Sequence, residues 1–246
     1  RFILENYAGL GELGVFALAA QFSGLILLAG TALDNAFMPH FLDEARRDSG
    51  KAQLGELVTK YVIVFGLIAL ALIAFGPAII LVMAVPEYHP AANFIAPLAL
   101  ASWIQVCCQP AIWSLTHSMR PATMTALRLL SVMVLILSAV WLVGERGAGV
   151  LGLAAAMCLA NLVMLFTSYG LSQRFFSMPL EWRKLLLSVT LLLAGGALLA
   201  WLPAQTLELS SIASRALVVT LVSLAALRLI GISNPFAYLL NTARGR

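Results

Sequence analysis

The chain has 246 residues, of which 61% are hydrophobic and only 11% are charged, and its mean hydropathy is +0.96. Soluble domains carry about 25% charged residues, so this composition excludes an ordinary soluble protein. The net charge of +4 does not indicate a nucleic-acid partner, because the basic residues lie in short segments without interleaved aromatic residues. We expect a membrane protein with little else attached, and no nucleic-acid binding.

Seven apolar stretches are long enough to cross a bilayer, since a spanning helix needs about 20 predominantly apolar residues. In chain order they cover residues 13–36, 57–83, 92–118, 122–143, 148–173, 185–203 and 209–231. The last stretch is the weakest, because only twelve uncharged residues separate Arg215 from Arg228. We retain it because two long cationic side chains can extend to opposite interfaces. The predicted fold class is all-α, a polytopic transmembrane helix bundle with seven spans.

The basic residues fall almost entirely between alternate pairs of spans. Only Arg1, Arg146 and Arg215 lie on one side of the membrane in this topology, and we expect Arg146 and Arg215 to anchor at the interface. Short loops rich in Lys and Arg stay in the cytoplasm, so the sequence predicts a multi-pass protein of the cell (inner or plasma) membrane with a cytoplasmic C-terminus. The other twelve basic residues share the predicted cytoplasmic side: Arg46, Arg47, Lys51, Lys60, Arg120, Arg128, Arg174, Arg183, Lys184, Arg228, Arg244 and Arg246.

The segments between the spans are short. On the outer side they cover residues 86–92, 144–147 and 203–207, so we expect no external domain. The longest cytoplasmic link, residues 43–56, has mixed charge and is interpreted as a solvated connector, partly helical with a break near Ser49 and Gly50. The alternative is a gate or a partner surface. The chain starts without Met or a signal-peptide pattern, and we expect it to be a fragment of a longer protein.

One face of the first span is polar. Ser23, Gly24, Thr31, Asp34 and Asn35 follow one stripe at helical spacing. A carboxylate costs about 2.5 to 3.5 kcal/mol at the centre of a membrane helix on insertion scales. Asp34 lies about twenty residues into this span, near the cytoplasmic interface, where that cost shrinks. Two interpretations of Asp34 stay open, a structural interfacial carboxylate and a cavity-lining group for ion coupling.

The third span carries a second polar face, formed by Ser102, Gln105, Gln109, Trp113 and Thr116. Amides, hydroxyls and an indole suit a sugar-facing wall, since hydroxyl groups need hydrogen bonds and the apolar side of a sugar packs on an aromatic ring. Hydrogen bonding between helices requires the same residue types, so both interpretations stay open.

Two further features belong to the third span. Pro110 is expected to break its hydrogen-bond ladder. His117 ends the span and titrates near neutral pH when unperturbed, which makes it a second candidate for ion coupling. The alternative is an ordinary interfacial histidine.

Other residue patterns indicate packing. Gly152, Ala156 and Ala160 repeat at four-residue spacing, which allows two helix backbones to approach closely. The three cysteines, at positions 107, 108 and 158, have neither metal-ligand nor disulfide spacing. We expect small reduced packing residues, and no metal or other cofactor.

Enzymatic activity is not expected. Gly50 and Lys51 lack the upstream glycine and the following Ser or Thr of a phosphate-binding loop, which argues against ATP hydrolysis. Glu87, Glu145 and Glu208 stand in separate short outer links and cannot pair for acid/base catalysis.

Five segments, taken in order, match short motifs of one transporter family. RFILENYAGLGELGVFALAAQF resembles the point at which a helix carrying Asp-Arg is followed by Gly-x-x-Glu-x-Gly-x-Tyr/Phe-x-x-Ala. NAFMPHFLDEARRD resembles a Phe-Pro-x-x-Ser/Leu helix end, and PEYHPAANFIAPLALASWIQ resembles a Tyr-x-x-Ala-x-x-x-x-Pro-x-Leu-Ala helix start. GAGVLGLAAAMCLANLV and MPLEWRKLL resemble Gly-x-x-Gly-Ala-Ala and Pro-x-x-Trp/Tyr-x-Arg/Lys. Together they resemble the C-terminal half of a polysaccharide or lipid-linked oligosaccharide flippase of the multidrug/oligosaccharidyl-lipid/polysaccharide exporter superfamily.

The resemblance implies an alternating-access transporter with two lobes of about six helices and two additional C-terminal helices. Residues 1–173 then form the C-terminal lobe, with the end of one helix and five spans. Residues 174–246 form two additional spans and a short cytoplasmic tail. The missing N-terminal lobe is an implied partner, and a multidrug exporter of the same fold or a non-transporting scaffold of a glycan assembly complex are the alternatives.

The resemblance also implies a substrate, a polyprenyl-pyrophosphate-linked oligosaccharide or polysaccharide precursor that moves from the cytoplasmic to the outer leaflet. Arg1 matches the Arg of the Asp-Arg pair and is expected to meet the pyrophosphate, although the Asp that precedes it is absent from this chain. The fourth span reads VMVLILSAVWLV where relatives carry Asn residues. The expected cavity residues are Arg1, Ser102, Gln105, Gln109 and Trp113, the expected coupling residues are Asp34 and His117, and the expected partners include membrane lipids and a glycan polymerase or glycosyltransferase.

Overall fold

A computed structural model describes residues 2–46, 51–118, 121–176, 179–201 and 209–229. The fold of these residues is all-α, as the composition predicts. Seven of their helical stretches are long and apolar enough to cross a membrane, and the chain is therefore a multi-pass membrane protein. They are Gly9–Asn35, Gln53–Met83, Pro86–His117, Pro121–Glu145, Gly149–Phe175, Trp182–Trp201 and Ser211–Arg228.

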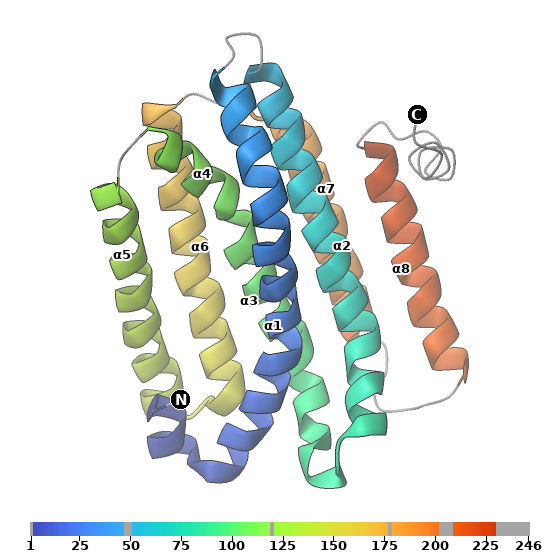
Figure 1. The fold of residues 1–246 in the computed structure, drawn as a ribbon. Helices are drawn as coiled ribbons and strands as arrows, with labels where there is room; N and C mark the ends of the chain where they lie inside the picture. Colours follow the sequence, from blue (N-terminus) through green and yellow to red (C-terminus); the bar gives the residue numbers. More distant parts are fainter. Residues whose placement is uncertain (1, 47–50, 119–120, 177–178, 202–208, 230–246) are drawn as a thin grey trace.

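Two long helices begin the bundle. Helix α1 (Phe2–Arg46) bends at Gly9, whose φ of 87° lies in the left-handed region that glycine adopts without a steric penalty. Helix α2 (Lys51–Met83) runs back beside it (Figure 1). The break expected near Ser49 and Gly50 falls outside the described residues, between the end of α1 at Arg46 and the start of α2 at Lys51.

The third span consists of three pieces. The short segment expected as an outer link is the 3₁₀ helix η1 (Pro86–Phe94), which is anchored by the buried residues Ala91 and Ala92. Helix α3 (Ile95–Cys107) follows it, and α4 (Gln109–His117) completes the span. The interruption expected at Pro110 is therefore confirmed.

The remaining spans lie within a few residues of their predicted ranges. Helix α5 (Pro121–Ala139) continues into the π-helical segment η2 (Val140–Glu145), and α6 (Gly149–Phe175) returns beside it. Helices α7 (Trp182–Trp201) and α8 (Leu209–Leu229) complete the described chain. The weakest predicted span is thus helical over nearly its whole predicted length.

Helix α3 is the centre of the bundle. In its span 67% of the most apolar window is buried, compared with 22% for the spans of α5 and α7 and 11% for that of α8. It packs against α1, α2 and α6, while α7 and α8 lie against α2 (Figure 1). The helices of the predicted lobe thus surround α3, and the last two helices add to one side of it.

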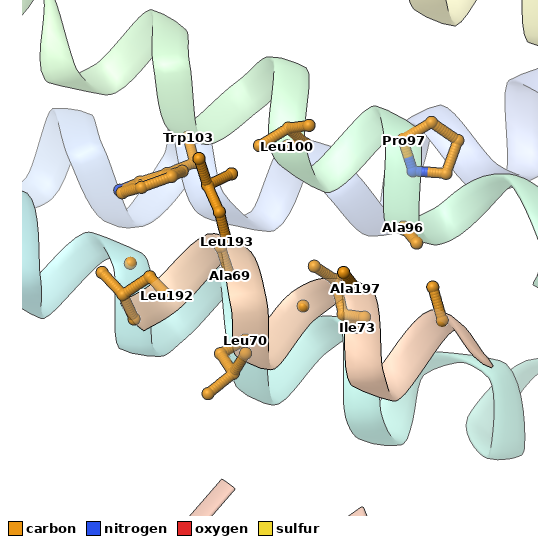
Figure 2. A pocket seen from close by; sticks show the side chains of 13 residues that line it. Ala69, Leu70, Ile73, Ala96, Pro97, Leu100, Trp103, Leu192, Leu193 and Ala197 are labelled. Carbon is orange, nitrogen blue, oxygen red and sulfur yellow. The ribbon is translucent and has the colours of Figure 1, made fainter. Parts of the chain in front are cut away.

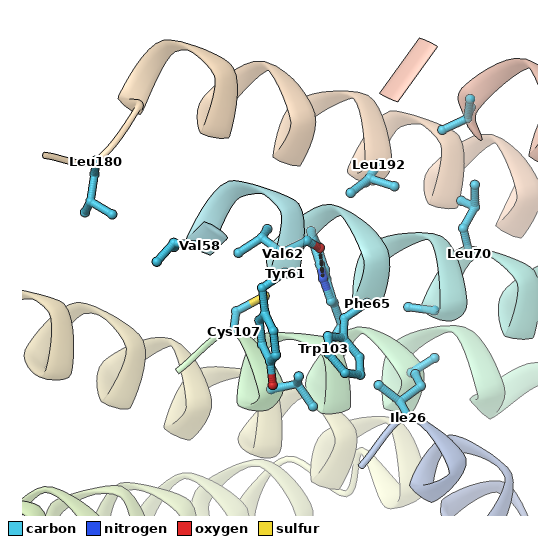
Figure 3. Close-up of a cluster of buried hydrophobic side chains, with 14 of the residues drawn as sticks. Ile26, Val58, Tyr61, Val62, Phe65, Leu70, Trp103, Cys107, Leu180 and Leu192 are labelled. Atoms are coloured by element: carbon cyan, nitrogen blue, oxygen red, sulfur yellow. Dashed lines mark hydrogen bonds between the residues drawn. The ribbon is translucent and has the colours of Figure 1, made fainter. Parts of the chain in front are cut away.

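Two apolar clusters hold these helices together. One joins α1 and α2 to α3, α4 and α7 and contains Tyr61, Phe65 and Trp103 (Figure 3). The indole Nε1 of Trp103 donates a hydrogen bond to the carbonyl oxygen of Val62 at 3.2 Å. The second cluster, around Ile95, joins the first half of α1 to η1, α3, α6 and η2.

Small residues set two of the helix contacts. Gly152, Ala156 and Ala160 are all buried, which confirms the packing interpretation of their spacing. A Cβ atom at Gly66 of α2 would lie 2.3 Å from the side chain of Leu192 in α7. Helix α7 therefore approaches α2 as closely as it does because residue 66 has no side chain.

The two ends of the bundle differ in charge. We call one of them the basic end; it is where α1 and α4 finish and α2 and α5 begin (Figure 1). Arg146 at the opposite end is exposed and lies 4.5 Å from the ring centroid of Trp141, as an interfacial anchor would. The described basic side chains at the basic end are Lys60, Arg128, Arg174, Arg183, Lys184 and Arg228.

Arg215 differs from the interfacial anchor that the sequence suggests. Only 5% of its surface is exposed. Its Nη1 atom donates a hydrogen bond to the carbonyl oxygen of Ala74 in α2 at 3.0 Å. Arg215 therefore joins α8 to α2 within the protein.

Candidate functional site

The polar residues of the bundle concentrate around the interruption of the third span. Pro110 has no amide hydrogen, and the amide of Cys108 donates to the carbonyl oxygen of Gln105 at 3.2 Å, which is the tighter three-residue spacing of a 3₁₀ turn. Gln105 stands ten residues after Ile95, about 15 Å along the helix axis. Val62, whose carbonyl oxygen accepts the Trp103 hydrogen bond, stands two residues after Lys60 of the basic end, so the interruption lies in the half of the span nearer that end.

Helix α6 supplies hydrogen bonds to the backbone on this interrupted span. The hydroxyl of Tyr169 donates to the carbonyl oxygen of Cys107 at 3.2 Å. The amide Nδ2 of Asn161 donates to the carbonyl oxygen of Ala101 at 2.8 Å. Backbone acceptors freed inside a membrane span require such partners, because hydrocarbon offers no water. Both side chains thus hold α3 in register with α6.

Asp34 lies beside an aromatic cluster. Its Oδ1 atom accepts a hydrogen bond of 2.7 Å from the hydroxyl of Tyr61 in α2. Asp34 is half-buried, whereas Tyr61 is buried. The ring of Tyr61 contacts those of Phe37, Phe65 and Trp113, with centroids 4.6 to 5.8 Å apart. Phe41 in turn contacts Trp113, with centroids 5.6 Å apart.

The polar face predicted on the third span does not form one surface. Ser102 and Trp113 are buried, and Trp113 contacts Phe41 and Tyr61 with ring centroids 5.6 and 5.1 Å apart. Gln105 is exposed. Gln109 and Thr116 are half-buried, and the Thr116 hydroxyl donates to the carbonyl oxygen of Ile112 at 2.9 Å. Of the five residues predicted for this face, Gln105 and Gln109 reach the surface with side-chain amides that have no hydrogen-bond partner in the described part of the chain.

Helix α1 places more polar groups at the same depth. A Cβ atom at Gly30 would lie 3.2 Å from the side chain of Val106, which fixes the relative height of α1 and α3. The two helices run in the same direction (Figure 1), so the exposed residues Thr31 and Asn35 stand at the level of α3's end and α4's first turn. Exposed polar side chains thus stand at nearly one level on two neighbouring helices, and we refer to them, together with Gln109, as the exposed polar zone.

The other predicted residues lie apart from this zone. The ring of His117 packs against Phe176, with centroids 5.2 Å apart and an edge-on geometry. Arg1 lies outside the described residues. Asp34 is therefore the expected coupling residue that stands beside the interrupted span.

Contacts between helices are made by three residues that the sequence interpretation overlooked and by Arg215, which it placed at the interface: Tyr61, Asn161, Tyr169 and Arg215. A signal for them was present, since each is a polar side chain inside an apolar stretch. Their partners are backbone carbonyls or residues far along the chain, which spacing within one helix does not reveal.

The described residues offer no metal site, and one of their cavities has almost entirely apolar walls. No group of three or more His, Cys, Asp or Glu side chains among them is arranged to hold a metal ion. A cavity of about 460 Å³ lies between α2, α3 and α7, with Leu70, Ile73, Trp103 and Leu193 among its lining (Figure 2). Its apolar walls suit a hydrocarbon chain and offer little to a sugar.

Comparisons with known proteins identify no relative of the chain. No protein-family model matches it, and neither a curated protein nor a solved structure does so.

Proposed function

We propose that the chain is the C-terminal lobe, with two additional helices, of a transporter that flips polyprenyl-pyrophosphate-linked glycans from the cytoplasmic to the outer leaflet. The observation that carries this proposal is the interrupted third span with its surface amides Gln105 and Gln109 inside a membrane-spanning stretch. An amide in contact with hydrocarbon costs several kcal/mol, so this surface favours a polar cavity over lipid. Discontinuous membrane helices are a recurring feature of transporter substrate sites.

An amphiphilic substrate fits the two kinds of surface on this lobe. The glycan would lie against the exposed polar zone of α1, α3 and α4, and the second lobe would supply the opposite wall. The prenyl chain can remain in the bilayer or in the apolar cavity between α2, α3 and α7. In this proposal the basic end faces the cytoplasm, as the rule for basic loops requires. The motif resemblance supports the same assignment.

Ion coupling belongs to the proposal as well. Asp34 is the carboxylate beside the interrupted span, and its hydrogen bond to Tyr61 connects α1 to α2. Binding of a proton or Na⁺ to Asp34 would weaken that bond and thereby link ion occupancy to the contact between two helices. His117 is the second candidate, at the end of α4.

Flipping in sealed vesicles tests the proposal. The purified full-length protein is reconstituted with a fluorescent polyprenyl-pyrophosphate oligosaccharide, and a membrane-impermeant quencher reports which leaflet holds the label. We expect Gln105→Leu together with Gln109→Leu to slow flipping at least about tenfold, the effect of raising the barrier by about 1.4 kcal/mol. Leu137→Met, on a 70% exposed apolar position of α5, is the control. Wild-type protein that co-purifies with glycosyltransferases but flips nothing would point to a scaffold and contradict the proposal.

A further inference from the structure

A second cavity lies between α4, α5 and α6 near the basic end. Its volume is about 330 Å³, and Ile112, Leu127, Arg128 and Met164 are among its lining residues. Neither the cavity between α2, α3 and α7 nor a third cavity, which has Phe22, Ile80 and Tyr88 in its lining, has a charged lining residue. Arg128 therefore makes this cavity chemically different from them.

Arg128 has no counter-ion in the part of the chain that the structure describes, where the ion pairs join Lys60 to Glu56 and Lys184 to Glu181. It stands seven residues after Pro121, the first residue of α5, which is about 10 Å along the helix axis. Arg128 is exposed, so the guanidinium can reach the headgroup layer while its stem follows the helix surface. A cation at this depth meets phosphate groups of the leaflet.

The neighbouring groups leave the guanidinium available for such a phosphate. The hydroxyl of Thr125, also in the lining, donates to the carbonyl oxygen of Pro121 at 3.1 Å. Guanidinium carries five N–H donors in a planar fork that matches two oxygens of a phosphate. The rest of the lining combines apolar side chains, which suit an acyl chain.

We propose that this cavity binds an anionic glycerophospholipid from the leaflet at the basic end. Its phosphate lies on Arg128, and one acyl chain lies along Ile112, Leu127 and Met164. Basic pockets between membrane helices recognise anionic headgroups in this way. The site does not depend on flipping, because it lies between helices of this chain and would be present in a multi-pass protein of any activity.

Thermal unfolding of the purified protein in detergent tests the proposal, with phosphatidylglycerol and phosphatidylcholine as the added lipids. We expect phosphatidylglycerol, but not phosphatidylcholine, to raise the melting temperature, and Arg128→Gln to weaken the apparent affinity about tenfold. Arg174→Gln removes another exposed arginine near the basic end that is outside the cavity lining, and it is expected to keep the wild-type response. Met164→Phe fills the space for the acyl chain without changing charge, and it is expected to weaken binding too.

Two results would overturn the proposal. One is an equal response of Arg128→Gln and wild-type protein to phosphatidylglycerol, with both melting alike in the absence of lipid. The other comes from repeating the measurement with polyprenyl pyrophosphate. If that lipid raises the melting temperature of the wild-type protein but not of Arg128→Gln, and phosphatidylglycerol has no effect, the cavity binds a pyrophosphate lipid instead.

Discussion

Arg215 of α8 donates a hydrogen bond to the carbonyl oxygen of Ala74 in α2. The acceptor stands three residues before Pro77, whose ring removes an amide donor from this part of α2. The guanidinium of α8 thus bonds the carbonyl next to that of Ile73, which is the one that Pro77 leaves without an amide donor. This contact joins the last described helix to the remainder of the bundle.

Replacing Arg215 with Met tests the importance of this contact for stability. We expect Arg215→Met to lower the free energy of unfolding by about 1.5 to 3 kcal/mol, the usual range for a hydrogen bond to a charged group. Arg146→Met is the matched control, because Arg146 is exposed and contacts Trp141 only on the surface. Unfolding in mixed micelles with increasing SDS measures both. Equal stabilities of the two variants would contradict a stabilising role for Arg215.

The bond between Asp34 and Tyr61 gives a second prediction. Tyr61→Phe leaves the half-buried carboxylate without its donor, and we expect a loss of about 1 to 3 kcal/mol in unfolding free energy. Tyr88→Phe, at a position 39% exposed, is expected to have little effect. Asp34→Asn keeps an oxygen acceptor for Tyr61 and should be milder than Tyr61→Phe. The prediction fails if both tyrosine variants unfold at the same denaturant concentration.

Gradient dependence tests Asp34 in transport. If Asp34 couples flipping to protons or Na⁺, collapse of the gradient slows the wild-type protein, and Asp34→Ala flips slowly with or without the gradient. Glu87→Ala, at an exposed position on η1, is the control and should keep the gradient response. Flipping rates in sealed vesicles with ionophores measure the effect. Unchanged flipping in either experiment would exclude coupling at Asp34.

The close approach of α2 and α7 gives a stability prediction. Gly66→Ala places a methyl group against Leu192, and we expect a loss of about 1 to 3 kcal/mol from overpacking. Adding Leu192→Ala makes room for the methyl group, so the double variant should be more stable than the sum of the two single changes. Gly170→Ala, which meets no neighbouring atom within 4 Å, is the control. Strict additivity in the double-mutant cycle would contradict this contact.

Orientation in the membrane is tested by labelling. If the basic end is cytoplasmic, a membrane-impermeant thiol reagent reacts with Arg146→Cys in intact cells and with Arg174→Cys only after the membrane is opened. Both positions are exposed. The wild-type chain gives the background, and its cysteines 107 and 108 are buried while 158 is partly so. The reverse labelling pattern would invert the proposed topology.

Much of the fold could be predicted from the sequence because it depends on local properties. Hydropathy located the seven spans, Pro110 located the interruption, and the spacing of Gly152, Ala156 and Ala160 identified a packing face. These features arise from segment length, from a missing amide hydrogen and from side-chain size, all of which can be read along one helix.

The arrangement of the candidate site could not be predicted in the same way. Gln105 and Trp113 are eight residues apart, which is about 80° around an uninterrupted helix, and the break at Cys108 changes their relation further. The sequence placed both on one face, whereas the structure exposes Gln105 and buries Trp113 among aromatic rings. Which face meets which neighbour depends on the rotation of every helix, and that rotation is settled by the packing of all of them together.

The interrupted third span has a mechanical consequence. Its two halves have separate attachments to α2, one through Trp103 and Val62 and the other through Trp113 and Tyr61. Both attachments are made to one turn of α2, which therefore holds the two halves of the span together beside the interruption. A change of angle at Cys108 has to strain or break one of these two attachments, so the halves of the span do not move independently of this turn of α2.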